Sequence, residues 1–168
     1  MREWIPMSTS PKGRLVLAAV RAFGANPYDE VTVGTLSADA GVTTGAIYHH
    51  FESKLGLYQF VRTDVERRLL DRMEGAASAA ADRSGALTSA MLVGFDFAVV
   101  QDFVRLLGDP SPGSQADALV DLFGRLSAPA PAPAGIILAA AWRAALRSVA
   151  DGASVTDARN ALGSLRLS

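Results

Sequence analysis

The chain has no cysteine, only two histidines, and few aromatic residues, which make up 7% of its 168 residues. Without cysteine it has no disulfide framework, no thiolate ligand for a metal and no cysteine nucleophile. Its formal net charge is −1, whereas proteins that coat nucleic acids without sequence preference are usually clearly basic. We therefore expect any contact with DNA to be local.

Long apolar runs are also missing. The start of the chain, MREWIPMSTS, holds no apolar run of signal-peptide length, and later apolar stretches meet an Arg or Asp before membrane-spanning length. We therefore expect a cytoplasmic protein with no membrane association. Hydrophobic residues make up 49% of the sequence, which favours a globular fold with one sizeable core.

Helical periodicity runs through the chain and no segment is typical of a strand, so the predicted fold class is all-α. Capping residues and glycines set the expected limits. The Ala-rich stretch AASAAADRSGA stays open between a helix start and a loop. The predicted helices cover residues 11–24, a short segment between Thr32 and Gly41, a second one from Thr43 to about His50, a long one from Ser53 to Gly75, residues 87–107, residues 116–126, residues 134–150 and a last one after Ser154, with Pro-rich breaks at 108–115 and 127–135.

The stretch TVGTLSADAGVTTGAIYHHFESK, residues 32–54, has the pattern of a helix, a tight Gly turn and a second helix. It resembles the DNA-binding domain of the tetracycline-repressor (TetR) family, and the resemblance extends over about residues 11–60. It implies a helix-turn-helix DNA-binding domain of three helices over residues 1–54 and a helical effector-binding and dimerisation domain over 55–168. The matching residues are Leu36, Ser37, Ala40, Gly41, Val42, Thr43, Gly45, Ile47, Tyr48, His50, Phe51 and Lys54.

The resemblance also implies roles for single residues. It assigns contacts with DNA phosphates to Thr43, Tyr48, His50 and Lys54. Contacts with base edges are assigned to Thr44, Gly45 and His49. Phe51 is interpreted as a core residue. The candidate DNA-binding residues are Thr32, Thr43, Thr44, Gly45, Tyr48, His49, His50 and Lys54.

Positive charge is scarce in this region. Residues 41–51, GVTTGAIYHHF, contain no Lys or Arg, and Thr44 and His49 occupy positions where relatives often carry one. Residues 1–54 hold five basic and five acidic side chains, which balance. We therefore expect DNA to be held by hydroxyls, a helix N-terminus and imidazoles, with weak electrostatic capture.

Metal binding and catalysis find little support in the sequence. Adjacent histidines point about 100° apart on a helix, which makes His49 and His50 poor partners for one metal ion. No nucleophile, base and orienting residue stand at a recognisable spacing. We predict no metal site, no cofactor and no enzymatic activity.

The second half of the sequence contains a carboxylate, Asp96, in an apolar helix. Such a group needs a partner, for which Arg143 or Arg147 is available, or it lies in a ligand cavity and favours a cationic or hydrogen-bond-donating effector. Aromatic and Met side chains nearby either line that cavity or form plain core. The candidate effector-pocket residues are Met73, Met91, Phe95, Asp96, Phe103, Trp142 and Arg143.

An apolar stripe with small flanking residues runs along AGIILAAAWRAALRSVA. The resemblance implies that the last two helices pair with those of a second copy, and an ordinary core helix is the competing interpretation. The candidate dimer-interface residues are Leu138, Trp142, Leu146, Val149 and Leu162.

These features predict a DNA-binding transcriptional regulator, a ligand-responsive repressor that binds a near-palindromic double-stranded DNA operator as a homodimer. Its effector would be an unidentified small molecule. The alternative is a TetR-like helical module that binds a ligand or a protein, with weak or no sequence-specific DNA binding.

Overall fold

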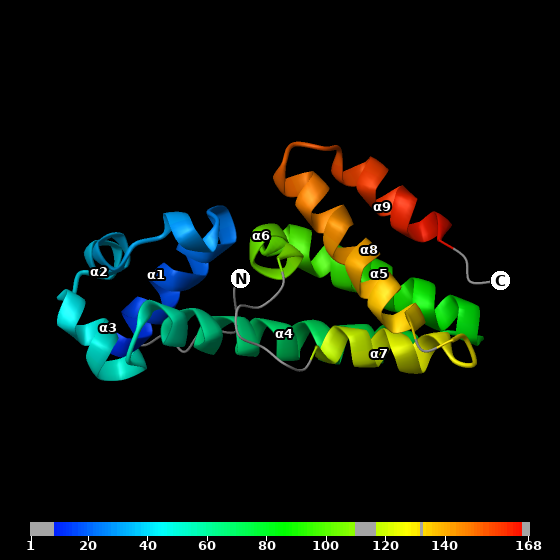
Figure 1. The fold of residues 1–168 in the computed structure, drawn as a ribbon, viewed down its shortest axis with the longest axis horizontal. Coiled ribbons are helices and arrows are strands. Elements are labelled where there is room, and N and C mark those ends of the chain that lie inside the picture. Colours follow the sequence, from blue (N-terminus) through cyan, green and yellow to red (C-terminus); the bar gives the residue numbers. More distant parts are fainter. Residues whose placement is uncertain (1–8, 110–116, 132, 166–168) are drawn as a thin grey trace. The chain divides into compact units, whose positions relative to one another are not determined.

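The computed structural model describes residues 9–109, 117–131 and 133–165, and these residues form helices and no strand (Figure 1). The predicted all-α fold class is confirmed. The chain divides into two compact units, residues 1–65 and 66–168, and the division falls inside one helix, α4 (Lys54–Ser78). The domain boundary expected after residue 54 lies at the start of that helix and stays a prediction.

The first unit contains the predicted helix-turn-helix. Its elements are α1 (Pro11–Ala25), a 3-10 turn η1 (Tyr28–Glu30), α2 (Val33–Ala40), α3 (Thr44–Phe51) and the first part of α4. The start of α1 has a local cause: the Ser10 hydroxyl accepts a hydrogen bond from the amide of Gly13 at 3.1 Å, with proline in the first turn of α1. Short-range signals therefore set this boundary.

The core of the first unit is built from one apolar face of each helix. Helix α1 packs against both α2 and α3 (Figure 1, blue to cyan). Leu36 of α2 and Ile47 of α3 are fully buried, so both helices of the motif are anchored inward by aliphatic side chains. The opposite faces remain free. The buried apolar residues of α1 to α3 are Leu15, Val16, Ala18, Ala19, Val20, Phe23, Leu36, Ala40, Ile47 and Phe51.

Two tight turns fix the direction of α3. Gly41 ends α2 in the left-handed conformation, with φ 62°, and its amide donates to the carbonyls of Ser37 and Ala38. After α3, the chain turns sharply into α4, and a Cβ on Gly56 would lie 2.0 Å from the carbonyl oxygen of Phe51. Only glycine fits there, so α3 and the start of α4 are held close together.

The second unit contains the rest of α4 together with α5 (Arg83–Val100), α6 (Val104–Gly108), α7 (Ala118–Ser127), α8 (Pro133–Ala150) and α9 (Val155–Ser164). Helix α8 packs against α5, α6, α7 and α9. It approaches α7 closely, since a Cβ on Gly135 would lie 2.5 Å from the carbonyl oxygen of Val120. Trp142 is fully buried and its indole N–H donates to the carbonyl of Met91 at 3.0 Å, which ties α8 to α5.

Two predicted helix limits are wrong. Gly75 does not end the long helix, which continues to Ser78; a Cβ there would meet nothing within 4 Å, so nothing forces a break. The single helix predicted over residues 87–107 is split at Gln101–Phe103, where Asp102 adopts φ 60°. Most of the predicted Pro-rich break at 108–115, from residue 110 on, lies outside the described residues. The predicted break at 127–135 separates α7 from α8.

Helix α5 is long and apolar enough to cross a membrane when judged by length and composition alone, the one such helix in the part of the chain that the structure describes. A core helix of a globular protein passes the same test. Here α5 packs against α7, α8 and α9, and 28% of the helix is buried.

Candidate nucleic-acid interface

Helix α3 has one buried and one exposed face. Ile47 and Phe51 point into the core, with 0% and 7% of their surface exposed, whereas Thr44, Gly45 and His49 are exposed. Tyr48 is 57% exposed, which is unusual for a large ring. Phe51 is therefore core, as the sequence predicts, and the other candidates on α3 line one accessible surface.

The first residues of this surface are hydroxyl side chains. Thr43 occupies the N-cap position of α3, but its hydroxyl makes no capping hydrogen bond, and it is exposed. The hydroxyl therefore remains available for another acceptor or donor. Thr32 behaves differently: it caps α2 by accepting from the amide of Thr35 at 3.1 Å, while its own amide donates to the Thr35 hydroxyl at 3.2 Å.

The two histidines lie at the C-terminal end of this surface, in the last turn of α3. Their ring centroids are 4.8 Å apart, and His50 is half-buried beside the ring of Phe51 at 6.3 Å, whereas His49 is exposed. His49 is thus the more accessible of the pair. Within the described ranges, no group of three or more His, Asp or Glu residues lies together in a way that holds a metal ion.

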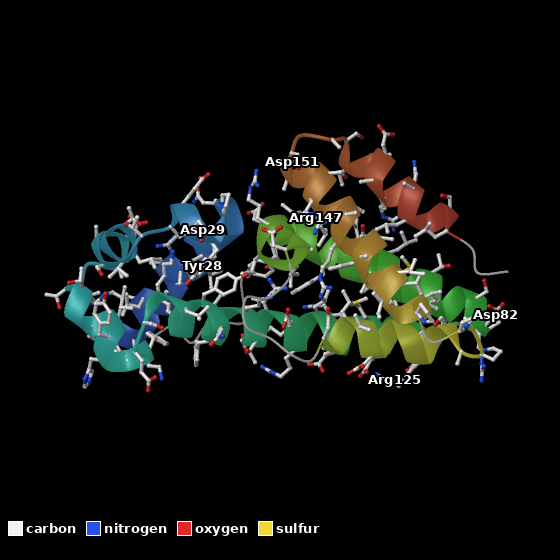
Figure 2. The ribbon with its side chains drawn as sticks, in the orientation of Figure 1. Tyr28, Asp29, Asp82, Arg125, Arg147 and Asp151 are labelled. Carbon is white, nitrogen blue, oxygen red and sulfur yellow. The ribbon has the colours of Figure 1, made fainter. Side chains whose placement is uncertain are left out.

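Lys54, expected to contact a phosphate, is instead engaged within the first unit. Its ammonium donates to the carbonyls of Tyr28 and Val31, both at 3.0 Å, and lies 4.0 Å from the centroid of the Tyr28 ring. Burial and the charge of the neighbouring Asp29 raise the pKa of Tyr28, which stays neutral (both residues are labelled in Figure 2). Lys54 therefore fastens η1 to the start of α4 and keeps one N–H for a further partner.

The sequence interpretation missed Arg14. Its Nε donates to the carbonyl of Ala40 at 2.9 Å and its Nη1 to that of Thr9 at 2.6 Å, so that α1 holds the C-terminal end of α2. The carbonyl groups at a helix end attract cations because they carry a partial negative charge. No local sequence signal pairs residues 26 positions apart.

In the second unit, the partner expected for Asp96 is wrong. Asp96 is bound by Arg159 of α9, at 2.8 Å from Nε and 2.9 Å from Nη2, and neither Arg143 nor Arg147 is involved. The two side chains are 44% and 42% exposed, so Asp96 does not lie in a buried apolar face. The pairing with Asp96 raises the pKa of Arg159. The arrangement fits the ion-pair alternative.

Arg143 instead binds Asp117, the N-cap residue of α7. Two guanidinium nitrogens reach the carboxylate at 2.7 and 2.9 Å, and the same carboxylate accepts from the amides of Leu119 and Val120. Burial alone would raise the pKa of Asp117, but the hydrogen bonds and charge of Arg143 outweigh it and hold that pKa below its ordinary value. The pair joins α8 to α7.

The remaining effector-pocket candidates are core side chains of the second unit: Met73, Met91, Phe95, Phe103 and Trp142 are each no more than 3% exposed. Four of the dimer-interface candidates are likewise buried within the chain itself, which fits the competing interpretation of an ordinary core helix. These four are Leu138, Trp142, Leu146 and Leu162, whereas Val149 is half-buried.

Comparison with known proteins agrees with this geometry. Residues 15–60 match the model of the family described as bacterial regulatory proteins, tetR family. Residues 15–60 therefore form a TetR-family DNA-binding domain. The match covers α2 and α3 in full, so α3 is the second helix of the helix-turn-helix in that domain.

Solved structures of regulatory proteins share the fold over nearly the whole chain. A putative tetR family transcription regulator from Shewanella sp. PV-4 is 20% identical, with a TM-score of 0.66 over 91% of this chain and 94% of its own. The fatty acid degradation regulator FadR from Bacillus halodurans is 15% identical, with a TM-score of 0.71 over 95% and 98%. LfrR from Mycobacterium smegmatis is 18% identical, with a TM-score of 0.61 over 92% and 99%. No curated protein sequence matches significantly.

Proposed function

We propose that this chain is a ligand-responsive repressor of the TetR family that binds a near-palindromic operator as a homodimer. The observation that carries the proposal is the two-faced α3. Its aliphatic side chains are fixed in the core, while Thr44, Gly45 and His49 are presented to solvent. A second helix of this kind enters the major groove with its N-terminal residues on the base edges.

Neutral side chains suffice for reading bases. The hydroxyl of Thr44 can donate, accept or place its methyl against thymine, and the absence of a side chain at Gly45 allows close approach. Thr43, Tyr48 and His50 would position the helix on the phosphates, which set its register without carrying sequence information. Lys54 has one N–H left for such a contact, because two already bind carbonyls. Thr32, whose hydroxyl caps α2, would act through that cap.

Dimerisation is best assigned to the outer face of α8. Ile136 and Ile137 are 61% and 63% exposed, and Ala140 and Ala144 continue the same stripe at helical spacing. Isoleucines at one end and alanines at the other allow two copies of this helix to cross closely. We expect a single change, Ile137→Glu, to give monomers by sedimentation, whereas Val100→Glu, at the more exposed site on α5 (74%), leaves the dimer mass unchanged.

The effector would bind in the second unit, whose core contains Met73, Met91, Phe95, Phe103 and Trp142. An apolar ligand fits this composition, and Asp96 and Arg143 offer no free charge because each is already paired. Helix α4 belongs to both units, so a shift of its C-terminal part is transmitted to the turn that holds α3. By linkage, a ligand that weakens operator binding must itself bind less tightly to the DNA complex.

Selection of binding sites from a random duplex library at two salt concentrations tests the proposal. Enrichment of a motif with two-fold symmetry is expected, with half-sites about one helical turn apart. If correctly folded protein enriches nothing at low salt, the repressor assignment is wrong. That result would favour a helical ligand-binding or protein-binding module, for which the balanced charge of residues 1–54 is the supporting observation.

A further inference from the structure

The first unit contains five described basic side chains, Lys12, Arg14, Arg21, Lys54 and Arg62. Three of them are committed to the fold: Arg14 and Lys54 donate to main-chain carbonyls, and Arg62 is 2% exposed and bonded to the Tyr58 hydroxyl. Lys12 and Arg21 are exposed. They are the candidates for positive charge that a polyanion can reach.

Lys12 differs from Arg21 in its surroundings. Its ammonium lies 5.6 Å from the ring centroid of Phe51 and 5.3 Å from that of Phe60, and the two rings are 5.4 Å apart. Both distances are within the range of cation–π attraction. Phe51 is the last residue of α3, so the ammonium of Lys12, although carried by α1, lies beside the C-terminal end of the recognition helix.

We propose that Lys12 contacts a DNA phosphate and supplies from α1 the positive charge that α3 lacks, with the rings of Phe51 and Phe60 as positioning groups. This inference rests on the proposed DNA binding. Ring faces hold an ammonium without accepting conventional hydrogen bonds, so its N–H groups stay available for phosphate oxygens. No carboxylate of the described residues is paired with it.

Helix length places this ammonium at the edge of the groove. Helix α3 has eight residues and is about 12 Å long at ~1.5 Å per residue. The major groove is about 12 Å wide. When the N-terminal residues of α3 reach the bases, its C-terminal end therefore lies at the phosphate rim, next to His50, which the resemblance also assigns to a phosphate.

Arg21 provides the matched control. It lies on the same helix and carries the same charge, but it is nine residues further along α1, or about 14 Å away. Changing either residue to glutamine alters the net charge equally. A general loss of electrostatic attraction would affect both variants alike, and a specific phosphate contact affects only Lys12.

The test measures the salt dependence of binding to the selected operator for the wild-type chain, Lys12→Gln, Lys12→Arg and Arg21→Gln. Each phosphate contact contributes about 0.9 to the slope of log affinity against log salt, so Lys12→Gln should flatten the dimer's slope by about 2. Lys12→Arg and Arg21→Gln should keep it. Equal slopes for wild type and Lys12→Gln, or equal losses in both glutamine variants, would overturn the assignment.

Phe60→Leu tests the positioning role separately, because Phe60 is 47% exposed and leucine retains its apolar contacts. The charge of Lys12 stays, so we expect affinity to fall about 2- to 5-fold, with the melting temperature nearly unchanged. Unchanged affinity would show that the ring does not position Lys12. If the wild-type chain selects no operator at all, the proposed function itself fails and the role of Lys12 in it fails with it.

Discussion

The two units of this chain use their positive charges in different ways. In the first unit, Arg14 and Lys54 donate to neutral main-chain carbonyls, and Lys12 lies over two phenyl rings. In the second unit, Arg143 and Arg159 each hold a carboxylate in two hydrogen bonds, and Arg125 binds Glu74 at 2.6 Å (Figure 2). Positive charge is neutralised at these three sites of the second unit, where Arg83 and Arg147 donate to main-chain carbonyls instead, and it remains unneutralised at the three sites of the first.

The difference explains how a first unit with balanced formal charge could still attract DNA. A cation bound to carbonyls or aromatic rings keeps its full charge and its field, whereas a cation in a bidentate ion pair does not. The exposed acidic residues Asp29, Glu30 and Asp39 lie outside α3, whereas the exposed Glu52 follows its last residue. The local arrangement of charge therefore matters more than the sum.

The largest effect is expected where an ion pair of the second unit is broken. Asp117→Ala should destabilise the protein by about 3 kcal/mol, because it removes the cap of α7 and leaves the guanidinium of Arg143, whose side chain is 12% exposed, without its carboxylate. Asp117→Asn should cost less, since the amide oxygen can still accept from the helix. Urea unfolding measures both, and wild-type stability in Asp117→Ala would contradict the assignment.

The same pair predicts a pH dependence. Because the folded-state pKa of Asp117 lies below its ordinary value of 3.8, its contribution is complete above that pH and is lost as the pH falls through the lowered pKa. The stability gap between wild type and Asp117→Asn should therefore be constant near neutral pH and close in acid. A gap that widened in acid would contradict this sign.

A second, smaller effect is expected at the carbonyl-bound cation of the first unit. Lys54→Met should cost about 2 kcal/mol, because the carbonyls of Tyr28 and Val31 lose their donor. Lys54→Arg keeps a donor and serves as the control. Thermal unfolding compares the two variants. If Lys54→Met melts at the same temperature as Lys54→Arg, Lys54 does not fasten η1 to α4.

Glu52→Gly should stabilise the protein by about 1 kcal/mol. Glu52 adopts φ 66°, and this backbone conformation is strained for any residue that has a Cβ. It also removes a carboxylate from the C-terminal end of α3, where a negative charge opposes the helix dipole and repels phosphates. Glu52→Gln removes the charge and keeps the strain. Operator affinity should rise in both variants, and stability against urea chiefly in the glycine variant.

The smallest effect is expected for the exposed ion pair of the second unit. A double-mutant cycle of Asp96→Asn and Arg159→Gln should give a coupling energy under about 1 kcal/mol, because both side chains are more than two-fifths exposed to solvent. The corresponding cycle for Asp117 and Arg143 should give more. Equal couplings would mean that burial does not distinguish the two pairs.

The sequence was sufficient for the features that depend on near neighbours. Ser10, Thr32 and Gly41 mark helix ends by local hydrogen bonds or a left-handed conformation, and the predicted limits of α2 and α3 follow from them. The exposed face of α3 was likewise predictable, because Ile47 and Phe51 repeat at helical spacing and the residues between them are polar or small.

Features that depend on distant residues were missed. The partner of Asp96 lies 63 positions away, and no pattern in the sequence favours Arg159 over Arg143 or Arg147. The break between α5 and α6 requires a positive φ at Asp102, a residue type that also occurs inside helices. The binding of Lys54 to carbonyls of η1 likewise depends on tertiary packing.

The proposed reading of DNA by the exposed face of α3 depends on the side chains of Thr44 and His49. Fluorescence anisotropy would compare the affinities of the wild type and the double variant Thr44→Ala, His49→Ala for the selected operator and for a scrambled duplex. Both side chains are exposed, so the variant should melt like the wild type. We predict that it loses at least about 10-fold of the discrimination between the duplexes. Full discrimination by a folded variant would contradict the account.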